Sequence, residues 1–171
     1  MKMNIELYPI EKHQREIVHR LFQFYLYDMA KLMKWPFSDK GNFQYESSIV
    51  DAYFSEKLHY PYFIKCDNKI IGFSLVRCYP ADKRLLDMGQ FYVAGMYVGS
   101  RIGEAAFKKT LQLYPGSWQV RVLEGNSSAD RFWNSVIQKV TSGNFKTNDG
   151  IYSGKKMKFY KFEYGSDAVR F

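Results

Sequence analysis

The segment from Asp87 to Leu123 is the part of this sequence that most constrains its fold. An aromatic, strand-like stretch, Asp87–Ala94, is followed by Gly99–Leu113, which has apolar residues at helical spacing. After a stop at Tyr114-Pro115-Gly116, Trp118–Leu123 again has strand character. A strand, a helix and a strand in this order imply two parallel neighbouring strands joined by a right-handed crossover. The pattern therefore predicts an α/β or α+β fold.

The residues before this segment predict a strand, two helices and a hairpin. Asn4–Ile10 is expected to be a strand, and Glu11–Trp35 a long helix that ends at Pro36. The helix should turn one apolar face inward, made of Val18, Leu21, Phe22, Tyr25, Met29 and Leu32. Ser48 is expected to cap a short second helix with Val50, Tyr53 and Phe54 facing the core. The turn-like pair Asp67-Asn68 then separates the strands Tyr62–Lys65 and Lys69–Arg77.

The residues after this segment predict one more helix and a closing pair of strands. Ser127 and Asp130 resemble a capping box at the start of the helix. Its inward stripe comprises Ala129, Phe132, Trp133, Val136, Ile137 and Val140. Strands are expected around Phe145 and over Lys156–Tyr164, with a turn at Asn148-Asp149-Gly150. In the crossover helix, Ile102, Ala105, Ala106 and Leu113 should face inward.

Length and composition favour one ordered domain spanning residues 1–171. The chain has 171 residues, of which 46% are hydrophobic and 18% aromatic, enough for a substantial core. It lacks a secretory signal and an apolar run long enough to span a bilayer, so we expect a cytoplasmic protein. Two cysteines without a CxxC spacing and three scattered histidines indicate no metal site. The aromatic C-terminal strands could pair within the chain or form a homodimer.

The net charge of +8 is compatible with a nucleic acid or a small polyanion as partner. The positive residues gather near the C-terminus and after the glycines, at Lys155, Lys156, Lys158, Lys161, Arg101, Lys108 and Lys109. A nucleic-acid surface would need aromatic residues interleaved with the basic ones on an exposed face. Alternation along Lys156–Phe162 suggests instead that its aromatic residues face a core, so nucleic-acid binding is disfavoured.

Gly95, Gly99 and Gly103 lie between the predicted strand and the crossover helix. Glycine lets the chain turn sharply and lets an anion approach the free N–H groups at a helix start. A P-loop is excluded because Glu104 follows Gly103, and the four-residue spacing does not match the dinucleotide fingerprint. The glycines therefore indicate either a site for a phosphorylated cofactor or a connection without a ligand.

The order of elements, taken with these glycines, resembles the GNAT superfamily of acyl-CoA-dependent N-acyltransferases over nearly the whole chain. Ile71–Val76 looks like the third strand of that family, Gln90–Val93 like the fourth and Val98–Gly103 like its pyrophosphate loop. The family pattern Asn-x-x-Ala-x-x-aromatic-aromatic is matched by Asn126, Ala129, Phe132 and Trp133. The resemblance implies a single domain with a mixed, mostly antiparallel central sheet, a parallel splayed strand pair and helices on both faces.

The resemblance also implies acetyl-CoA as co-substrate and assigns its site. The main chain of Phe91 and Val93 would contact the thioester and the pantetheine arm, and Asn126 would contact that arm as well. The pyrophosphate would bind the loop of Val98, Gly99, Ser100, Arg101, Ile102 and Gly103. This loop departs from the family pattern, because Val98 and Arg101 replace its first residue and its middle glycine. Arg101 either offers its guanidinium to a phosphate oxygen, points away from the loop or blocks it. Phosphate contact is favoured, because a cation at a helix start opposes the helix dipole unless an anion is present.

The catalytic positions implied by the resemblance are Gln90, Phe91 and Trp133. Many relatives have a glutamate and a tyrosine where this chain has Gln90 and Trp133, neither of which can exchange a proton. Asp87, Glu124, Tyr92 and Tyr97 are the nearby alternatives, and structural roles are favoured for them. The acceptor, a small-molecule or peptide amine, should meet walls formed by Tyr25, Tyr27, Asp28, Trp35 and Phe37.

Three functions are therefore compatible with the sequence. The first is an N-acetyltransferase that transfers the acetyl group directly from acetyl-CoA to an amine. The second is a regulatory module that keeps the acyl-CoA cleft without turnover, as the Gln90 and Trp133 replacements suggest. A basic nucleic-acid-binding domain is the third and weakest.

Overall fold

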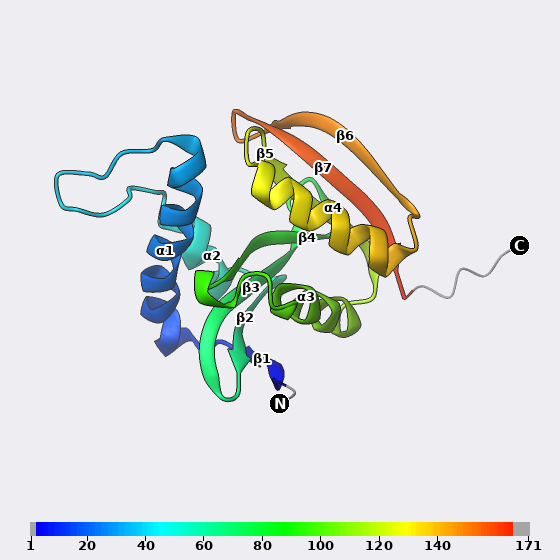
Figure 1. The fold of residues 1–171 in the computed structure, drawn as a ribbon, viewed down its shortest axis with the longest axis horizontal. Coiled ribbons are helices and arrows are strands. Elements are labelled where there is room, and N and C mark those ends of the chain that lie inside the picture. The colour runs from blue at the N-terminus through cyan, green and yellow to red at the C-terminus, as the bar shows by residue number, and fades with distance from the viewer. Residues whose placement is uncertain (1–2, 166–171) are drawn as a thin grey trace, which may run out of the picture.

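A seven-stranded sheet runs through the part of the computed structural model that is described here, residues 3–165 (Figure 1). Its strands lie in the order β1-β2-β3-β4-β5-β7-β6. Only the β4–β5 pair is parallel, and the other neighbouring strands are antiparallel. The strands are β1 (Ile5–Pro9), β2 (His59–Cys66), β3 (Lys69–Tyr79), β4 (Asp82–Val93), β5 (Gly116–Leu123), β6 (Phe145–Tyr152) and β7 (Lys155–Tyr164). The prediction of a mixed, mostly antiparallel sheet is confirmed.

Helices cover both faces of the sheet, as predicted (Figure 1). One face carries α1 and α2, and the other carries α3 and α4. Two short 3₁₀ turns, η1 and η2, precede α1 and follow β4. The helical elements are η1 (Lys12–Gln14), α1 (Arg15–Met33), α2 (Ser48–Ser55), η2 (Gly95–Tyr97), α3 (Ile102–Leu113) and α4 (Ser127–Thr141).

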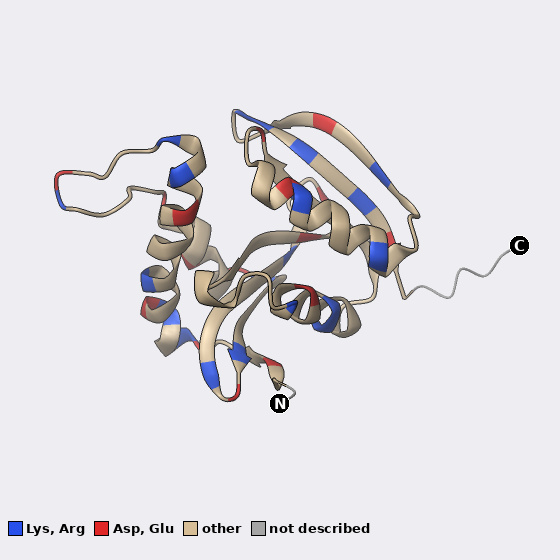
Figure 2. Cartoon of the chain, viewed as in Figure 1, with Lys and Arg blue, Asp and Glu red and all other residues tan. Residues whose placement is uncertain are grey.

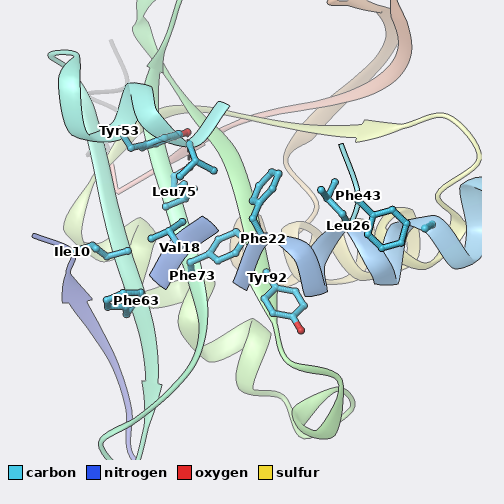
Figure 3. Close-up of a cluster of buried hydrophobic side chains, with 12 residues drawn as sticks. Ile10, Val18, Phe22, Leu26, Phe43, Tyr53, Phe63, Phe73, Leu75 and Tyr92 are labelled. Carbon is cyan, nitrogen blue, oxygen red and sulfur yellow. Dashed lines mark hydrogen bonds between the residues drawn. The ribbon is translucent and has the colours of Figure 1, made fainter. Parts of the chain in front are cut away.

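The core under α1 and α2 is built largely from aromatic rings (Figure 3). Phe22 of α1 stacks on Phe73 of β3, with 6.0 Å between ring centroids. Phe63 and Leu75 are almost completely buried beside them. Each such side chain contributes about 1.5–3 kcal/mol by leaving water, which explains why this face of α1 sets the position of the helix on the sheet.

The core under α3 and α4 contains the buried rings of Phe107, Trp118, Trp133, Tyr160 and Phe162. Tyr160 and Phe162 come from the basic strand β7, and their burial confirms that its aromatic residues face a core. Figure 2 shows Lys and Arg on helices and on the β6–β7 ribbon, interspersed with acidic residues. Phe159 of the same strand is buried as well, so these three rings of β7 do not form the exposed aromatic face that was considered for nucleic-acid binding.

Several predicted helix ends were wrong by a few residues. The first helix begins at Arg15 and stops at Met33, before a left-handed Lys34, because the residues ahead of Pro36 leave the helical conformation. Ser47 rather than Ser48 occupies the N-cap position of α2, without a side-chain capping hydrogen bond, and α3 begins at Ile102 rather than Gly99. Leu32 and Leu113, expected inside, are 42% and 52% exposed, since each lies at the end of its helix beyond the sheet.

The predicted capping box before α4 was also wrong. Asn126 is the N-cap, and its side-chain oxygen accepts the Ala129 N–H at 3.1 Å. Ser127 is already the first residue of the helix.

The predicted turn at Asn148-Asp149-Gly150 lies inside β6, where it pairs with Met157–Phe159 of β7. Gly150 fits there because a Cβ atom would lie 2.8 Å from the Phe159 ring. The hairpin instead turns at Ser153-Gly154, both with positive φ, as a tight two-residue turn requires. The turn predicted at Asp67-Asn68 is confirmed, and both residues have positive φ.

Candidate functional site

The sheet opens between β4 and β5. These strands pair only from Leu86–Trp118 to Met88–Val120, although β4 continues to Val93 and β5 to Leu123. The predicted splayed pair is therefore present. Beyond Met88 one edge of β4 has no strand neighbour, so its main-chain groups are available to a ligand.

A β-bulge at Gly89 lies at the point where the strands separate. Leu75 of β3 pairs with Gln90, whereas Val76 pairs with Met88, so Gly89 is the extra residue. The Tyr53 side chain from α2 packs directly on Gly89, and its hydroxyl donates to the Leu75 carbonyl at 3.1 Å. A Cβ atom at position 89 would collide with that hydroxyl. Glycine is required here for close packing rather than for a positive φ.

The free edge of β4 presents particular main-chain groups. Ala94 donates its N–H to Ile71 of β3, and successive residues of a strand direct these groups to opposite sides. Tyr92 and Gln90 therefore face β3 by the same alternation. The N–H and C=O groups of Phe91 and Val93 face the opening instead.

A cleft of about 1140 Å³ passes through this opening. Its walls come from α1, the α1–α2 connection, α2, the separated ends of β4 and β5, the start of α4 and the β6–β7 hairpin. The cleft thus joins the two faces of the sheet. Across it, Lys155 of the hairpin lies over Trp35, 5.3 Å from the ring centroid.

Seven of the residues predicted for the site line this cleft: Tyr25, Trp35, Phe37, Gln90, Phe91, Asn126 and Trp133. Tyr27 and Asp28 lie outside it, because they are on the outer surface of α1, where both contact Lys31. Val93 and the whole of Val98–Gly103 also lie outside its walls.

Gln90, Asn126 and Trp133 bring unused hydrogen-bonding atoms to the cleft. Among residues 3–165, nothing bonds the Gln90 amide, Asn126 Nδ2 or Trp133 Nε1. No fully buried side-chain nitrogen or oxygen of the described residues lacks a partner, so these atoms contact accessible space. The Phe91 ring packs edge-on against Trp133, 5.3 Å between centroids, which holds the indole at the opening.

The glycine-containing connection leads into the start of α3. Its N-cap, Arg101, has a left-handed backbone with φ of 64°, and Gly99 has φ of 85°. The first hydrogen bond of α3 runs from Ala105 to Arg101. The N–H groups from Arg101 to Glu104 have no partner among the described residues, and no side chain caps them. These four donors and the helix dipole favour an anion at this position.

A group of charged side chains lies on the α1/α2 side of the opening. Arg77 donates to Asp87 Oδ2 at 2.9 Å, and Arg121 donates to both Asp87 oxygens at 3.0 and 2.9 Å. Tyr152 accepts from Arg77 at 2.6 Å, and its ring lies 3.9 Å from the Arg121 guanidinium carbon. Burial opposes the charge of Arg77, yet Asp87 raises the pKa of this side chain above its ordinary value. Arg77 therefore remains charged.

Tyr25 and Tyr45 of the cleft stay protonated at neutral pH. Burial raises the pKa of Tyr25 to about 12, although the nearby Arg121 charge acts in the opposite direction. Burial, with the charges of Asp51 and Glu16, raises the pKa of Tyr45 to about 12. These hydroxyls can donate hydrogen bonds, but they cannot serve as bases.

No protein-family model matches the sequence, and the comparison with curated proteins gives no match. Solved structures do match. A protein assigned as an acetyltransferase of the GNAT family from Desulfovibrio desulfuricans superposes with a TM-score of 0.60 at 13% identity, covering 95% of this chain and 99% of that one. An acetyltransferase from Thermus thermophilus gives 0.64 at 13% identity, with 94% and 97% coverage.

A third structure was determined with a ligand. YncA from Salmonella typhimurium, assigned as an acetyltransferase and solved with its cofactor acetyl-CoA, gives a TM-score of 0.61 at 11% identity, covering 98% and 96%. This chain has the GNAT fold. At these identities the likeness shows the fold alone.

Gly103 has a packing role within this GNAT fold. A Cβ atom there would lie 3.1 Å from the Phe132 ring, which itself stacks on Phe91 at 6.1 Å between centroids. Gly103 therefore lets α3 approach α4 closely, whatever binds the loop. The interpretation of this glycine from the loop pattern alone missed this contact.

The sequence interpretation missed Arg77, Arg121 and Tyr152 as parts of the GNAT cleft. One signal was available: each arginine stands between apolar residues of a strand, Arg77 between Val76 and Cys78 and Arg121 between Val120 and Val122. Asp87, expected to have a structural role, is completely buried between them.

Residues 3–165 contain no cluster of His, Cys, Asp and Glu side chains arranged to hold a metal ion. Within that same range, no helix has both the length and the hydropathy to cross a bilayer.

Proposed function

We propose that this protein is an N-acetyltransferase that transfers an acetyl group from acetyl-CoA directly to an amine. The observation that carries the proposal is the opening between β4 and β5, which joins two faces of the sheet in one cleft. A cofactor can enter such a cleft from one face and an acceptor from the other. The GNAT fold, shared with a protein solved with acetyl-CoA, supports the same conclusion.

The cofactor would lie along the free edge of β4. In this arrangement the main chain of Phe91 and Val93 pairs with the pantetheine arm, and Asn126 Nδ2 donates to it. The N–H groups from Arg101 to Glu104 hold the pyrophosphate at the start of α3, and the Arg101 guanidinium adds a charged contact. Val98, Gly99 and Ser100 shape the connection, while Ile102 anchors it in the core, being 2% exposed.

The chemistry needs few protein groups. The amine nitrogen attacks the thioester carbon, a main-chain N–H of the opened strand stabilises the oxyanion, and the C–S bond breaks to release CoA thiolate. Gln90 orients the amine or a water, and Trp133 donates a hydrogen bond through Nε1. Since neither side chain can titrate, water accepts the amine proton and protonates the thiolate.

The acceptor would enter from the α1/α2 side. Tyr25, Trp35 and Phe37 form aromatic walls there. The α1–α2 connection that carries Trp35 and Phe37 is fixed to α1, because Phe43 and Gln23 exchange two hydrogen bonds of 2.8 and 3.0 Å. Tyr27 and Asp28 stay candidates only for contacts outside the cleft.

Calorimetric titration with acetyl-CoA tests the cofactor site. The protein should bind one equivalent, and Arg101→Glu should weaken the affinity by about tenfold or more, because it places a negative charge against the pyrophosphate. Arg84→Glu is the matched control: this arginine is exposed near the far end of β4 and should leave the affinity unchanged. If the parent protein does not bind acetyl-CoA, the proposal is wrong.

A second candidate is a regulatory module that binds acyl-CoA without turnover. Gln90 and Trp133 favour it, since neither can exchange a proton. Release of CoA thiol in the presence of a broad amine panel separates the two functions. Binding without release would establish the module and contradict the enzyme.

A further inference from the structure

We propose that the acceptor amine carries an anionic group, a carboxylate or a phosphate, which binds the guanidinium groups of Arg77 and Arg121. The inference deepens the proposed function and depends on it for the reacting centre. The anion site itself depends only on the residues described below.

The charges around Asp87 do not balance. Two guanidinium groups share one carboxylate that is completely buried and accepts bonds from both. One positive charge is therefore left without a counter-ion, on side chains that are only 16% (Arg77) and 6% (Arg121) exposed. Burying a net charge is costly, and an anion entering the cleft would remove that cost.

Both arginines have donors to spare. Neither Arg77 Nη1 nor Arg121 Nη1 bonds any residue in the range 3–165. Arg121 has a side chain only 6% exposed, yet no fully buried polar atom in that range is left without a partner. Its free nitrogen must therefore reach accessible space, and the cleft that both arginines line is that space.

The two guanidinium groups are held in place before any ligand arrives. Asp87 holds Arg121 through a two-bond fork, and the Tyr152 ring covers one face of the same guanidinium. Tyr152 also accepts a bond from Arg77. A planar, fixed guanidinium suits the two oxygens of a carboxylate or phosphate better than a mobile lysine would.

The remaining charges of the cleft favour the same class of ligand. Its walls carry three cations, Arg77, Arg121 and Lys155, against one carboxylate, that of the exposed Glu46. A cationic acceptor such as a diamine or a lysine-rich peptide would meet net repulsion. An amine with a negative group would be attracted.

The position of the arginines relative to the opening sets the orientation of the acceptor in the cleft. Asp87 precedes the bulge at Gly89 by two residues, and the free edge of β4 begins just after it. The anionic group would therefore bind at the closed end of the opening. The amine would then reach toward Gln90 and the thioester.

Rates of acetyl transfer to matched amines test the proposal. β-Alanine is compared with β-alaninamide, and O-phosphoethanolamine with ethanolamine, so that the two anionic groups are examined separately. We expect kcat/KM to favour at least one anionic amine over its neutral partner by about tenfold or more, as charged hydrogen bonds allow. Equal rates, or a preference for neutral amines or putrescine, would overturn the proposal and leave the acetyltransferase function intact.

Substitutions test whether the arginines cause the preference for anionic amines. Arg77→Gln leaves the Arg121–Asp87 fork in place and should reduce the preference to about threefold or less, with unchanged affinity for acetyl-CoA. Arg20→Gln is the control, since it removes an exposed charge of α1 that does not line the cleft. If Arg77→Gln weakens acetyl-CoA binding and leaves the acceptor preference unchanged, the arginines contact the cofactor and the proposal is wrong.

A binding measurement does not require turnover. N-acetyl-β-alanine and inorganic phosphate are titrated into the protein without CoA, with N-acetyl-β-alaninamide as the neutral comparison. Saturable binding of either anion that is lost in Arg77→Gln supports the site even if acetyl-CoA fails to bind. Failure of both anions to bind, alone and with CoA present, contradicts it.

Discussion

Asn126 combines two roles at the scale of a single residue. Its side-chain oxygen caps α4 by accepting the Ala129 N–H, and its Nδ2 reaches the cleft. The cap is a contribution to stability, whereas the amide nitrogen is available to the proposed cofactor. Because the two atoms differ in chemistry, substitution can separate the roles.

Asn126→Asp keeps an acceptor for the cap and removes the donor. We expect its free energy of unfolding to stay within about 0.5 kcal/mol of the parent, while its affinity for acetyl-CoA falls several-fold. Asn126→Ala should lose about 1 kcal/mol of stability as well. Denaturant unfolding and calorimetry measure the two quantities. Unchanged cofactor affinity in Asn126→Asp would remove Asn126 from the proposed site.

At the scale of the element, the bulge in β4 and the α2 helix depend on each other. Tyr53 occupies the volume that a side chain at Gly89 would need, and the pair lies where the sheet opens. Burial raises the pKa of Tyr53, so its hydroxyl remains a donor to the Leu75 carbonyl at all ordinary pH values.

Gly89→Ala should destabilise the protein by about 1–3 kcal/mol, because the new methyl group overpacks against the Tyr53 hydroxyl. Tyr53→Phe alone should cost about 1 kcal/mol through the lost hydrogen bond. The double variant should be more stable than the sum of the two losses predicts, since removing the hydroxyl makes room for the methyl group. Gly95→Ala, where a Cβ atom meets nothing within 4 Å, is the control. Additive losses in chemical denaturation would show that the contact is not the cause.

Helices α3 and α4 are joined by Glu104, which binds Lys139 at 2.7 Å and Lys108 at 2.9 Å. The hydrogen bonds from Lys139 and Lys108 lower the pKa of this carboxyl in the folded protein. The stabilisation by ionised Glu104 is therefore complete above the ordinary glutamate pKa. It is lost as the pH falls through the lowered pKa of the folded protein.

Glu104→Gln should accordingly lower the melting temperature at pH 7 by roughly 1–3 °C. The difference from the parent should shrink below about pH 4.3 and vanish at lower pH, where both side chains are uncharged. Glu56→Gln is the control, as this exposed carboxylate has no ion-pair partner within residues 3–165. A difference that persists at pH 2.5 in thermal scans would mean that lost packing, not charge, is responsible.

At the scale of the whole molecule, the order of the elements could be predicted from local patterns. Along β3, Phe73 and Leu75 pack on the α1/α2 side, whereas Val76 packs on the α3/α4 side and Ser74 contacts Thr110 of α3. The Asp67-Asn68 turn and the crossover from β4 to β5 fixed the neighbours of the central strands. The prediction of a turn at Asn148–Gly150 was wrong because Gly150 serves another purpose. It makes room for the Phe159 ring, which belongs to a different strand.

The candidate site could be predicted only in part, for a similar reason. Gln90, Phe91, Asn126 and Trp133 follow a pattern along the chain, and all four line the cleft. The partners of Asp87 depend on the registers of three strands: Arg77 lies opposite it on β3, and Arg121 follows its β5 neighbour by two residues. Local spacing contains no information on such registers.

The cleft also places two tryptophans where their fluorescence can respond to a ligand. Of its three tryptophans, Trp118 is completely buried, whereas Trp133 lines the cleft from α4 and Trp35 lines it from the α1–α2 connection. The Lys155 ammonium group over Trp35 makes the emission of that indole sensitive to charge on the acceptor side. Trp133, which lines the cleft from the other face of the sheet, should respond to a ligand on the side proposed for the cofactor. Intrinsic fluorescence of variants that keep only Trp35 or only Trp133 should therefore distinguish which half of the cleft is filled.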